Sequence, residues 1–324
     1  MAWRDLSKEE RKRRRKHLNL ISSIVLIVLL LVGFLCIHPL MVKHYRKMLT
    51  EKGFYHPVSV GDHSLNLLRY GNENGSRQIV VMSGFGVGDS SVSMRKMTAG
   101  LEKDNQLIIL DRAGYGTSDD TKTKMNAETI VEDYRTALKN ADIEAPYTLM
   151  AHSIAGVYAS YWVSKYPDEI DSVILLDTTW VIEENADDNV ASAVISEYVK
   201  YFAAKIGLAD LLMPSSVDGT KDEKKIAKAL TSMTMDSRTL ISEAKLEPEN
   251  IKAALDVLTS NDIPKLYINC GKELPDEARK NLESYTDKLG NCQIELLDSG
   301  HFMYLEKPDE SAKIIQDFID SLNS

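Results

Sequence analysis

One serine lies where a strand is expected to run directly into a helix. Residues 147–150 are a short apolar run typical of a buried strand, and 155–166 carry apolar residues at helical spacing. Ser153 falls in the turn between them, and Ala151 and Ala155 on its two sides are small enough for strand and helix to approach closely. An ordinary strand–helix connection can also contain a serine, but this turn would expose the hydroxyl above a sheet edge. Ser153 is therefore a candidate nucleophile.

A histidine follows the last apolar run of the chain. Residues 293–297 form that run, and His301 comes four residues after its end. Because active sites of open α/β sheets lie outside the carboxyl ends of the strands, His301 and Ser153 are expected on one rim. A histidine there can act as the general base for a serine, so this role is predicted for His301. His152, beside the serine, is expected to leave the turn in another direction and to pack.

A glycine-rich turn follows another apolar run. Residues 83–86 read Ser-Gly-Phe-Gly and come directly after 79–82. Such a turn can direct a backbone N–H toward the nucleophile, and the first helical turn after Ser153 offers a second one. The predicted oxyanion hole consists of the N–H groups of Phe85 and Ile154. A glycine-rich turn could also serve the chain reversal alone.

The spacing of apolar residues indicates which elements must position these groups. Short apolar runs alternate with helical patterns, which specifies an α/β fold with a doubly wound, mostly parallel sheet. The predicted strands are 79–82, 106–110, 147–150, 172–176, 265–269 and 293–297, preceded by a hairpin of 57–60 and 64–70. The predicted helices are 127–140, 155–166, 275–289 and 308–322. The stretch of about 179–262 contains turn residues and helical patterns but no convincing strand, so it is expected to be a helical insertion.

The N-terminus indicates a membrane anchor. Residues 18–37 carry no charged side chain and are long enough, as a helix, to cross a bilayer. Residues 1–17 carry a charge of +5, whereas the whole chain carries −9. The positive-inside rule then leaves the N-terminus in the cytoplasm and the body outside. We expect a basic cytoplasmic segment at 1–17, a transmembrane anchor at 18–42, a juxtamembrane linker at 43–56 and the folded domain at 57–324. A cleaved signal peptide is the alternative, but the apolar run is long and its exit lacks a small-x-small site.

Charge and cysteine usage exclude several classes of partner. The acidic body argues against nucleic acid binding, which needs clustered positive charge. No His, Cys and carboxylate cluster has metal-ligand spacing, so neither a metal nor an organic cofactor is predicted.

Cys270 ends one predicted strand and Cys292 opens the next. If these strands are parallel neighbours, the two thiols lie at opposite ends, roughly 15 Å apart, and remain free.

Four segments occur in an order that resembles the α/β-hydrolase superfamily, in particular its proline-iminopeptidase-like and esterase-like branch with a helical cap. They are 83–86, the stretch Asp-Arg-Ala-Gly-Tyr-Gly-Thr-Ser at 111–118, the turn around Ser153, and Ser299-Gly300-His301. The resemblance covers about 57–324 and implies a Ser-His-acid triad without a cofactor, with 111–118 as a structural loop. Two departures stand out: Ser83 replaces the usual His, and Ala flanks Ser153 where Gly is usual.

The acid of the triad is left open by this resemblance. The family usually places an Asp in the loop after its seventh strand, and here that spacing falls on Leu274. Glu273 lies one residue before it and Asp276 two residues after it. Asp177, at the end of the preceding strand, occupies an alternative location known in relatives. We rank Glu273 first, Asp177 close behind it and Asp276 third.

The activity that the resemblance implies is hydrolysis of an acyl bond, of the ester type, in a small-molecule substrate. An aminopeptidase-like amide hydrolase is the alternative within enzymes, and an inactive hydrolase-fold binding protein is the alternative outside them. Ser153 and His301 argue for an enzyme. The sequence does not indicate the acyl group or the oligomeric state.

Overall fold

An eight-stranded sheet forms the centre of the computed structural model, which describes residues 7–33, 38–209 and 215–322. The strand order is β1-β2-β4-β3-β5-β6-β7-β8; β2 is antiparallel to both of its neighbours, and the remaining pairs are parallel. The strands are β1 (Pro57–Ser59), β2 (Ser64–Gly71), β3 (Gln78–Met82), β4 (Gln106–Asp111), β5 (Tyr147–His152), β6 (Ile170–Leu176), β7 (Lys265–Cys270) and β8 (Cys292–Leu297). Each begins and ends within two residues of its predicted range, so the predicted α/β sheet and its opening hairpin are confirmed.

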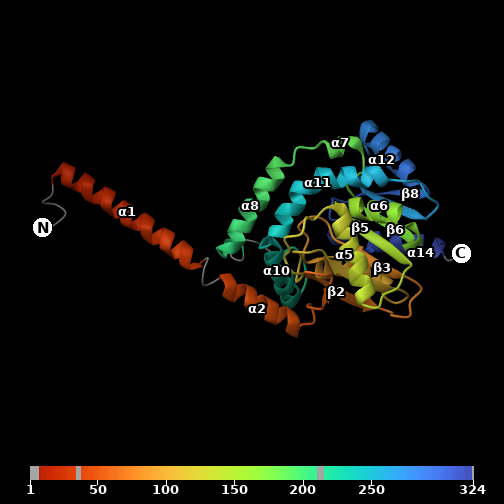
Figure 1. The fold of residues 1–324 in the computed structure, drawn as a ribbon, viewed down its shortest axis with the longest axis horizontal. Coiled ribbons are helices and arrows are strands. Elements are labelled where there is room, and N and C mark those ends of the chain that lie inside the picture. Colours follow the sequence, from red (N-terminus) through yellow and green to blue (C-terminus); the bar gives the residue numbers. More distant parts are fainter. Residues whose placement is uncertain (1–6, 34–37, 210–214, 323–324) are drawn as a thin grey trace.

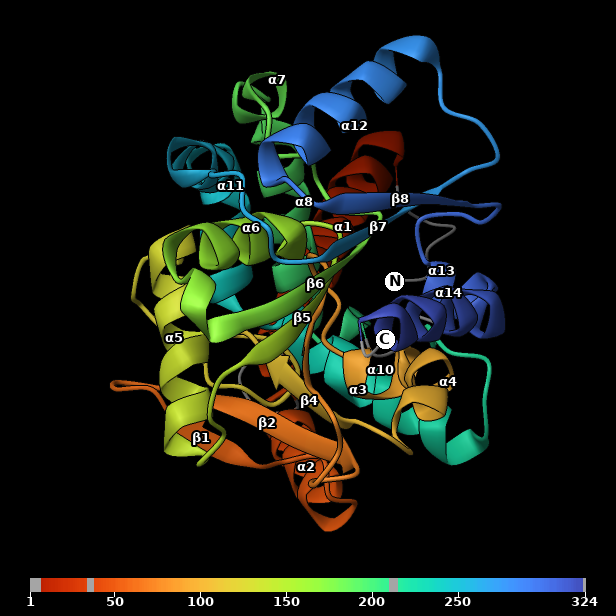
Figure 2. The ribbon, with the colours of Figure 1, turned by 90° about the vertical axis from the view of Figure 1, so that its right-hand side faces the viewer.

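Helices cover both faces of the sheet (Figure 2). Alternate strand residues point to opposite faces, so Val80 and Leu149 join one buried cluster, whereas Ile79 and Met150 join the other. The first face is covered by α5 (Ala127–Asn140), α6 (Ala155–Lys165) and α12 (Asp276–Leu289), and the second by α4 (Arg95–Thr98), α13 (Met303–Glu306) and α14 (Pro308–Ser321). Shorter helices are α3 (Ser90–Ser93), η3 (Ala99–Leu101) and η4 (Pro167–Glu169). The sheet is therefore packed between two helical layers.

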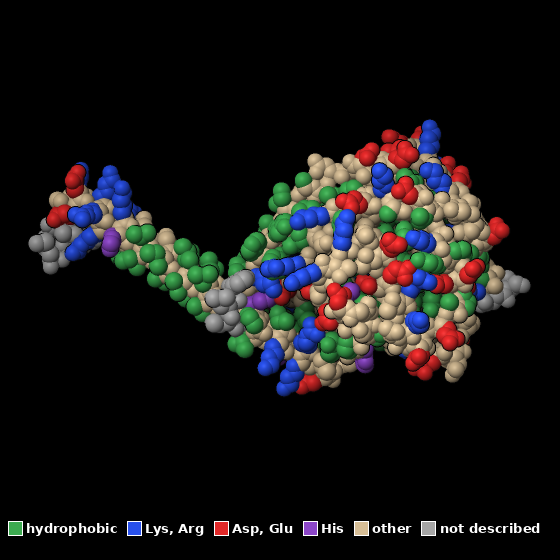
Figure 3. Space-filling model, in the orientation of Figure 1, with side chains coloured by type: hydrophobic (Ala, Val, Ile, Leu, Met, Phe, Trp, Pro, Cys, Tyr) green, Lys and Arg blue, Asp and Glu red, His purple; other side chains and the backbone are tan. Residues whose placement is uncertain are grey.

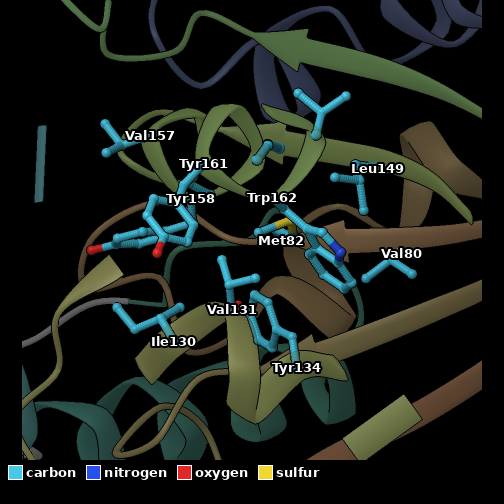
Figure 4. Close-up of a cluster of buried hydrophobic side chains, with 14 of the residues drawn as sticks. Val80, Met82, Ile130, Val131, Tyr134, Leu149, Val157, Tyr158, Tyr161 and Trp162 are labelled. Atoms are coloured by element: carbon cyan, nitrogen blue, oxygen red, sulfur yellow. The ribbon is translucent and has the colours of Figure 1, made fainter. Parts of the chain in front are cut away.

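A cluster of buried aromatic and aliphatic side chains lies between β5, α5 and α6 (Figure 4). Trp162 is fully buried there, and its ring lies 6.2 Å from that of Tyr134 and 6.0 Å from that of Tyr147. An indole of this size buries one of the largest apolar surfaces that a side chain offers. The cluster fixes α6 on the strand that leads into Ser153.

A helical cap separates β6 from β7, as the sequence predicts. It contains α7 (Glu183–Ala186), α8 (Ala191–Lys205), α10 (Lys221–Met235) and α11 (Arg238–Val257). Local signals begin two of these helices: Thr220 and Glu223 form a reciprocal capping box before α10, and the Ser237 hydroxyl accepts from the backbone at the start of α11. In Figure 1, α8 forms the outer edge of the cap.

Two helices precede the sheet. Helix α1 (Lys8–Val32) projects from the body and has no buried residue (Figure 1), and it is long and apolar enough to cross a membrane. Helix α2 (His38–Glu51) packs on the body, where Met48 and Leu49 contact Ile226 and Leu230 of α10. The range predicted as an anchor, 18–42, thus extends into α2, and the range predicted as a linker is helical up to Glu51.

The two body cysteines lie where the sequence places them. β7 and β8 are parallel neighbours, Cys292 pairs with Lys265 at one end, and Cys270 pairs with Leu297 at the other. Both thiols are free, which confirms the prediction.

The packing of α2 leads to a stability prediction. Leu49 is fully buried between α2 and α10, whereas Leu40 on the same helix is 67% exposed. Leu49→Ala is expected to lower the free energy of unfolding by about 2–5 kcal/mol, because it removes buried methyl groups and leaves a cavity. Leu40→Ala is the matched control and should change it by less than about 0.5 kcal/mol. Urea unfolding of the full chain in detergent measures both, and equal losses would mean that α2 does not pack as described.

Candidate active site

Ser153 occupies a strained turn between β5 and α6. Its φ of 57° is left-handed, which is unfavourable for a residue with a side chain. Backbone hydrogen bonds hold it there: the Ser153 N–H donates to the Leu176 carbonyl (3.2 Å), and the Ser153 carbonyl accepts from Gly156 (3.0 Å) and Thr179 (3.1 Å). The turn therefore has the shape expected from the sequence, and the backbone after β6 fixes it.

The close approach of α6 to the β6 end depends on a glycine. A Cβ at Gly156 would lie 2.3 Å from the Cβ of Thr178, which is far closer than van der Waals contact allows. The absence of a side chain at Gly156 thus lets the first turn of α6 lie directly on the segment that carries Asp177.

The imidazole of His301 connects Ser153 to Asp177. Its Nε2 lies 3.0 Å from Ser153 Oγ, and its Nδ1 lies 2.7 Å from Asp177 Oδ2. If the Nδ1–H of His301 donates to the carboxylate, the lone pair of Nε2 is free to accept the serine proton. The second carboxylate oxygen, Asp177 Oδ1, accepts the backbone N–H of Cys270 at 3.0 Å. This geometry is that of a nucleophile, a base and an orienting acid.

Hydrogen bonds keep Asp177 ionised. Burial favours the neutral acid, but the hydrogen bonds from His301 and from the Cys270 N–H outweigh it, and the pKa of Asp177 lies below its usual value. A negative Asp177 can therefore stabilise a positive charge on the His301 ring.

The other two acid candidates lie elsewhere. Glu273 is exposed in the loop after β7, and Asp276 is exposed in the first turn of α12. Within the described ranges, no hydrogen bond or ion pair joins either side chain to His301, whereas Asp177 contacts its ring directly. The structure thus brings together Ser153, His301 and Asp177, but not the acid that was ranked first.

His152 supports the loop that carries His301. Its Nε2–H donates to the His301 carbonyl oxygen at 3.0 Å, and the two ring centroids are 4.6 Å apart. The side chain is buried, and burial lowers the pKa of His152 to about 4. His152 therefore remains a neutral imidazole that packs, as expected, and also positions the base.

The glycine-rich turn passes directly beside the serine. A Cβ at Gly84 would lie 2.7 Å from His152 Nδ1 and 3.0 Å from Ser153 Cβ, so a side chain at 84 would force this turn away. In the described part of the chain, the backbone N–H groups of Phe85 and Ile154 donate no hydrogen bond. Two free donors at this position can stabilise an oxyanion.

A buried ion pair beneath this turn was not anticipated from the sequence. Arg112 is 1% exposed and donates to the carbonyl oxygens of Ser83 (2.5 Å) and Gly84 (3.2 Å). Its Nε lies 3.1 Å from Oε1 of Glu243, which comes from cap helix α11. Glu243 also accepts from the hydroxyls of Tyr115 and Tyr158, each at 2.8 Å. The sequence signal that could have indicated this contact is Glu243 itself, a charged residue among apolar ones in the predicted helical insertion.

The described residues contain no group of three or more His, Cys, Asp or Glu side chains that could hold a metal ion.

The strand order, the cap after β6 and the Ser153 turn define an α/β-hydrolase fold. A family model described as alpha/beta hydrolase fold matches residues 79–217. Among solved structures, epoxide hydrolase CorEH has a TM-score of 0.64 at 16% identity and covers 83% of this chain and 99% of its own. Haloalkane dehalogenase DatA from Agrobacterium tumefaciens has a TM-score of 0.63 at 16% identity, over 82% and 96% of the two chains.

Two sequence relatives match most of the chain. The Bacillus subtilis protein YbdG is 26% identical over 316 residues, which cover 92% of this chain and 95% of that protein. Monoacylglycerol lipase ABHD6 of Homo sapiens is 21% identical over 236 residues, covering 69% and 70%. The chain therefore has the α/β-hydrolase fold and matches a family model of that fold, which confirms the resemblance found in the sequence.

The low pKa of His152 leads to a pH prediction. An unfolded His titrates near 6.5, and buried His152 near 4, so the unfolded state binds more protons between these values. Stability should therefore fall as the pH drops from 6.5 toward 4, with a contribution of about 2 kcal/mol lost by pH 5. His152→Gln should remove that part of the pH dependence in urea unfolding. Exposed Leu40 provides the control, since Leu40→Ala removes no titratable group and should leave the dependence unchanged. An unaltered slope in His152→Gln would contradict the burial argument.

Proposed function

We propose that this chain is a serine hydrolase that cleaves carboxylic-ester bonds, with Ser153 as nucleophile, His301 as general base and Asp177 as the acid. The observation that carries the proposal is the hydrogen-bond chain from Asp177 Oδ2 through the His301 ring to Ser153 Oγ, with distances of 2.7 and 3.0 Å. The proposal assigns to Asp177 the role for which the sequence ranked Glu273 first.

The proposed reaction has two steps. His301 Nε2 takes the Ser153 proton while Oγ attacks the acyl carbonyl, and the N–H groups of Phe85 and Ile154 donate to the oxyanion. Collapse of the tetrahedral intermediate breaks the bond to the alcohol, which leaves with the proton from His301. A water molecule, deprotonated by His301, then attacks the acyl-serine and releases the carboxylic acid. Asp177 holds the ring in the required tautomer and stabilises the imidazolium in both steps.

One observation favours an ester substrate, and a second fits hydrolysis of the acyl-serine. The similarity to a protein named monoacylglycerol lipase supports acyl-ester chemistry. The side chain of His301 is 43% exposed, so water can reach the base for the second step.

We further propose that α1 anchors the enzyme in a membrane, with the N-terminus in the cytoplasm and the hydrolase domain outside. The helix has 25 residues, none of them buried against the body, and its first half carries the basic run of 8–16. The charge asymmetry supports this orientation.

Loss of the nucleophile is the first test. Ser153→Ala should abolish covalent labelling by a fluorophosphonate probe and lower turnover of a short soluble ester by several orders of magnitude. The control is Ser164→Ala, at the far end of α6, which should label and turn over like the parent. Labelling that persists in Ser153→Ala would assign the nucleophile to another residue.

The acid is tested by three amide substitutions. Asp177→Asn should lower turnover by about 10³–10⁴-fold with the fold intact by circular dichroism, because an amide does not stabilise the imidazolium. Glu273→Gln and Asp276→Asn should keep near-parental turnover. A large loss in Glu273→Gln together with an active Asp177→Asn would restore the first-ranked acid of the sequence.

A further inference from the structure

An apolar stripe runs along the outer face of cap helix α8. Ile195, Tyr198, Val199 and Phe202 are spaced i, i+3, i+4 and i+7, so they share one face of the helix. Their exposures are 64%, 41%, 64% and 60%. The opposite face, with buried Glu197 and Ala204, packs on α10 and α11. Water-soluble surfaces rarely leave such a continuous stripe open, so it marks a binding surface. We call these four residues the α8 stripe.

The C-terminal end of α8 lies next to the C-terminal end of α1. A Cβ at Gly33, directly after α1, would lie 3.9 Å from the carbonyl oxygen of Ile206, directly after α8. A Cβ at Gly207 would lie 3.7 Å from Met41 Sδ of α2. Figure 1 shows α8 lying crosswise to α1, on the side of the body from which α1 projects. In Figure 3, hydrophobic side chains gather over α8, on the side of the body from which α1 projects.

The body is tied closely to the end of α1. Only four residues separate Gly33 from His38, which spans at most about 18 Å. His38 is 6% exposed, and its Nε2 lies 2.9 Å from Asp236 Oδ2, so α2 is fixed on the cap. A bilayer that contains α1 must therefore have its surface close to α8.

The charges around the α8 stripe suit a lipid headgroup layer. The acid of α8, Glu197, is buried and paired with Lys200 at 2.6 Å. Cations flank the stripe: Lys245 Nζ lies 3.0 Å from the Tyr198 hydroxyl, and Arg238 Nε lies 3.0 Å from the Tyr201 hydroxyl. An apolar face with a cationic border is the pattern of a helix that lies in a membrane interface. It contrasts with a body that is acidic overall.

We propose that the α8 stripe lies on the bilayer surface, with its apolar side chains below the headgroups, and holds the cap against the membrane that contains α1. This inference rests on the proposed anchoring by α1 and goes beyond it, because a spanning helix alone does not insert the side chains of α8 below the headgroups.

Quenching by lipid tests the contact directly. The full chain is reconstituted in phosphatidylcholine–phosphatidylglycerol vesicles with plain or brominated acyl chains, and the emission of Phe202→Trp is measured after subtraction of the parent. Brominated lipid should reduce the added emission at least twofold. The matched control is Leu296→Trp, since Leu296 is 38% exposed and its edge strand β8 lies on the opposite side of the body from α1 in Figure 1. Its emission should be the same in both lipids.

Flotation and probe labelling of the same samples separate the possible failures. A chain that floats with the vesicles but shows equal Phe202→Trp emission in both lipids overturns the α8 proposal and leaves the anchor intact. If Phe202→Trp emission is the same in both lipids and its wavelength shifts when the protein is diluted, a second copy of the chain covers the α8 stripe. This outcome also overturns the α8 proposal. A chain that does not float overturns the anchor together with the α8 contact. Fluorophosphonate labelling reports the proposed serine chemistry independently in every sample.

Discussion

The hydrogen bonds between the Ser153 turn and the end of β6 constrain the rest of the site. Leu176 and Thr179 bind the backbone of Ser153 on both sides, and Asp177 lies between them with a φ of 44°. The same short segment therefore holds the nucleophile in its left-handed turn and directs the carboxylate toward His301. Two strained residues side by side are tolerated because parallel pairing of β5 with β6 fixes the chain before both. A shift of one residue in that pairing would misplace the serine and the acid together.

The glycine-rich turn of residues 83–86 depends on a second contact, which extends into the cap. Arg112 binds the Ser83 and Gly84 carbonyls, and Glu243 of α11 compensates its charge inside the core. Removing two charges from water is costly, and a buried pair of this kind is retained only where hydrogen bonds satisfy both groups. Here, the hydroxyls of Tyr115 and Tyr158 complete the partners of Glu243. The position of α11 is thereby coupled to that of the turn beside Ser153, so the cap contributes to the site even where it does not contact the serine.

The sequence allowed the sheet, the serine and the histidine to be predicted, but not the network that joins them. Strands buried on both faces appear as uninterrupted apolar runs. Small residues on both sides of Ser153 indicated a turn in which a strand and a helix approach each other closely. The acid was different, because its choice depended on spacing in the loop after β7. The register of β6 against β7 pairs Leu176 with Ile268, and this places Asp177 beside the N–H of Cys270. No local pattern encodes that alignment. Glu243 and α2 were missed for the same reason, since both depend on partners more than a hundred residues away.

The pair of imidazoles at the site shows how one histidine can remain a base beside another. With ring centroids 4.6 Å apart, a positive charge on His152 would oppose protonation of His301. Burial prevents this: His152 remains neutral because the core penalises its charged form, and its Nε2–H is used to hold the His301 carbonyl. The His301 ring is instead partly exposed and faces the Asp177 carboxylate. Of these two adjacent histidines, burial thus keeps His152 a neutral donor, whereas the His301 ring stays partly exposed between Asp177 and Ser153.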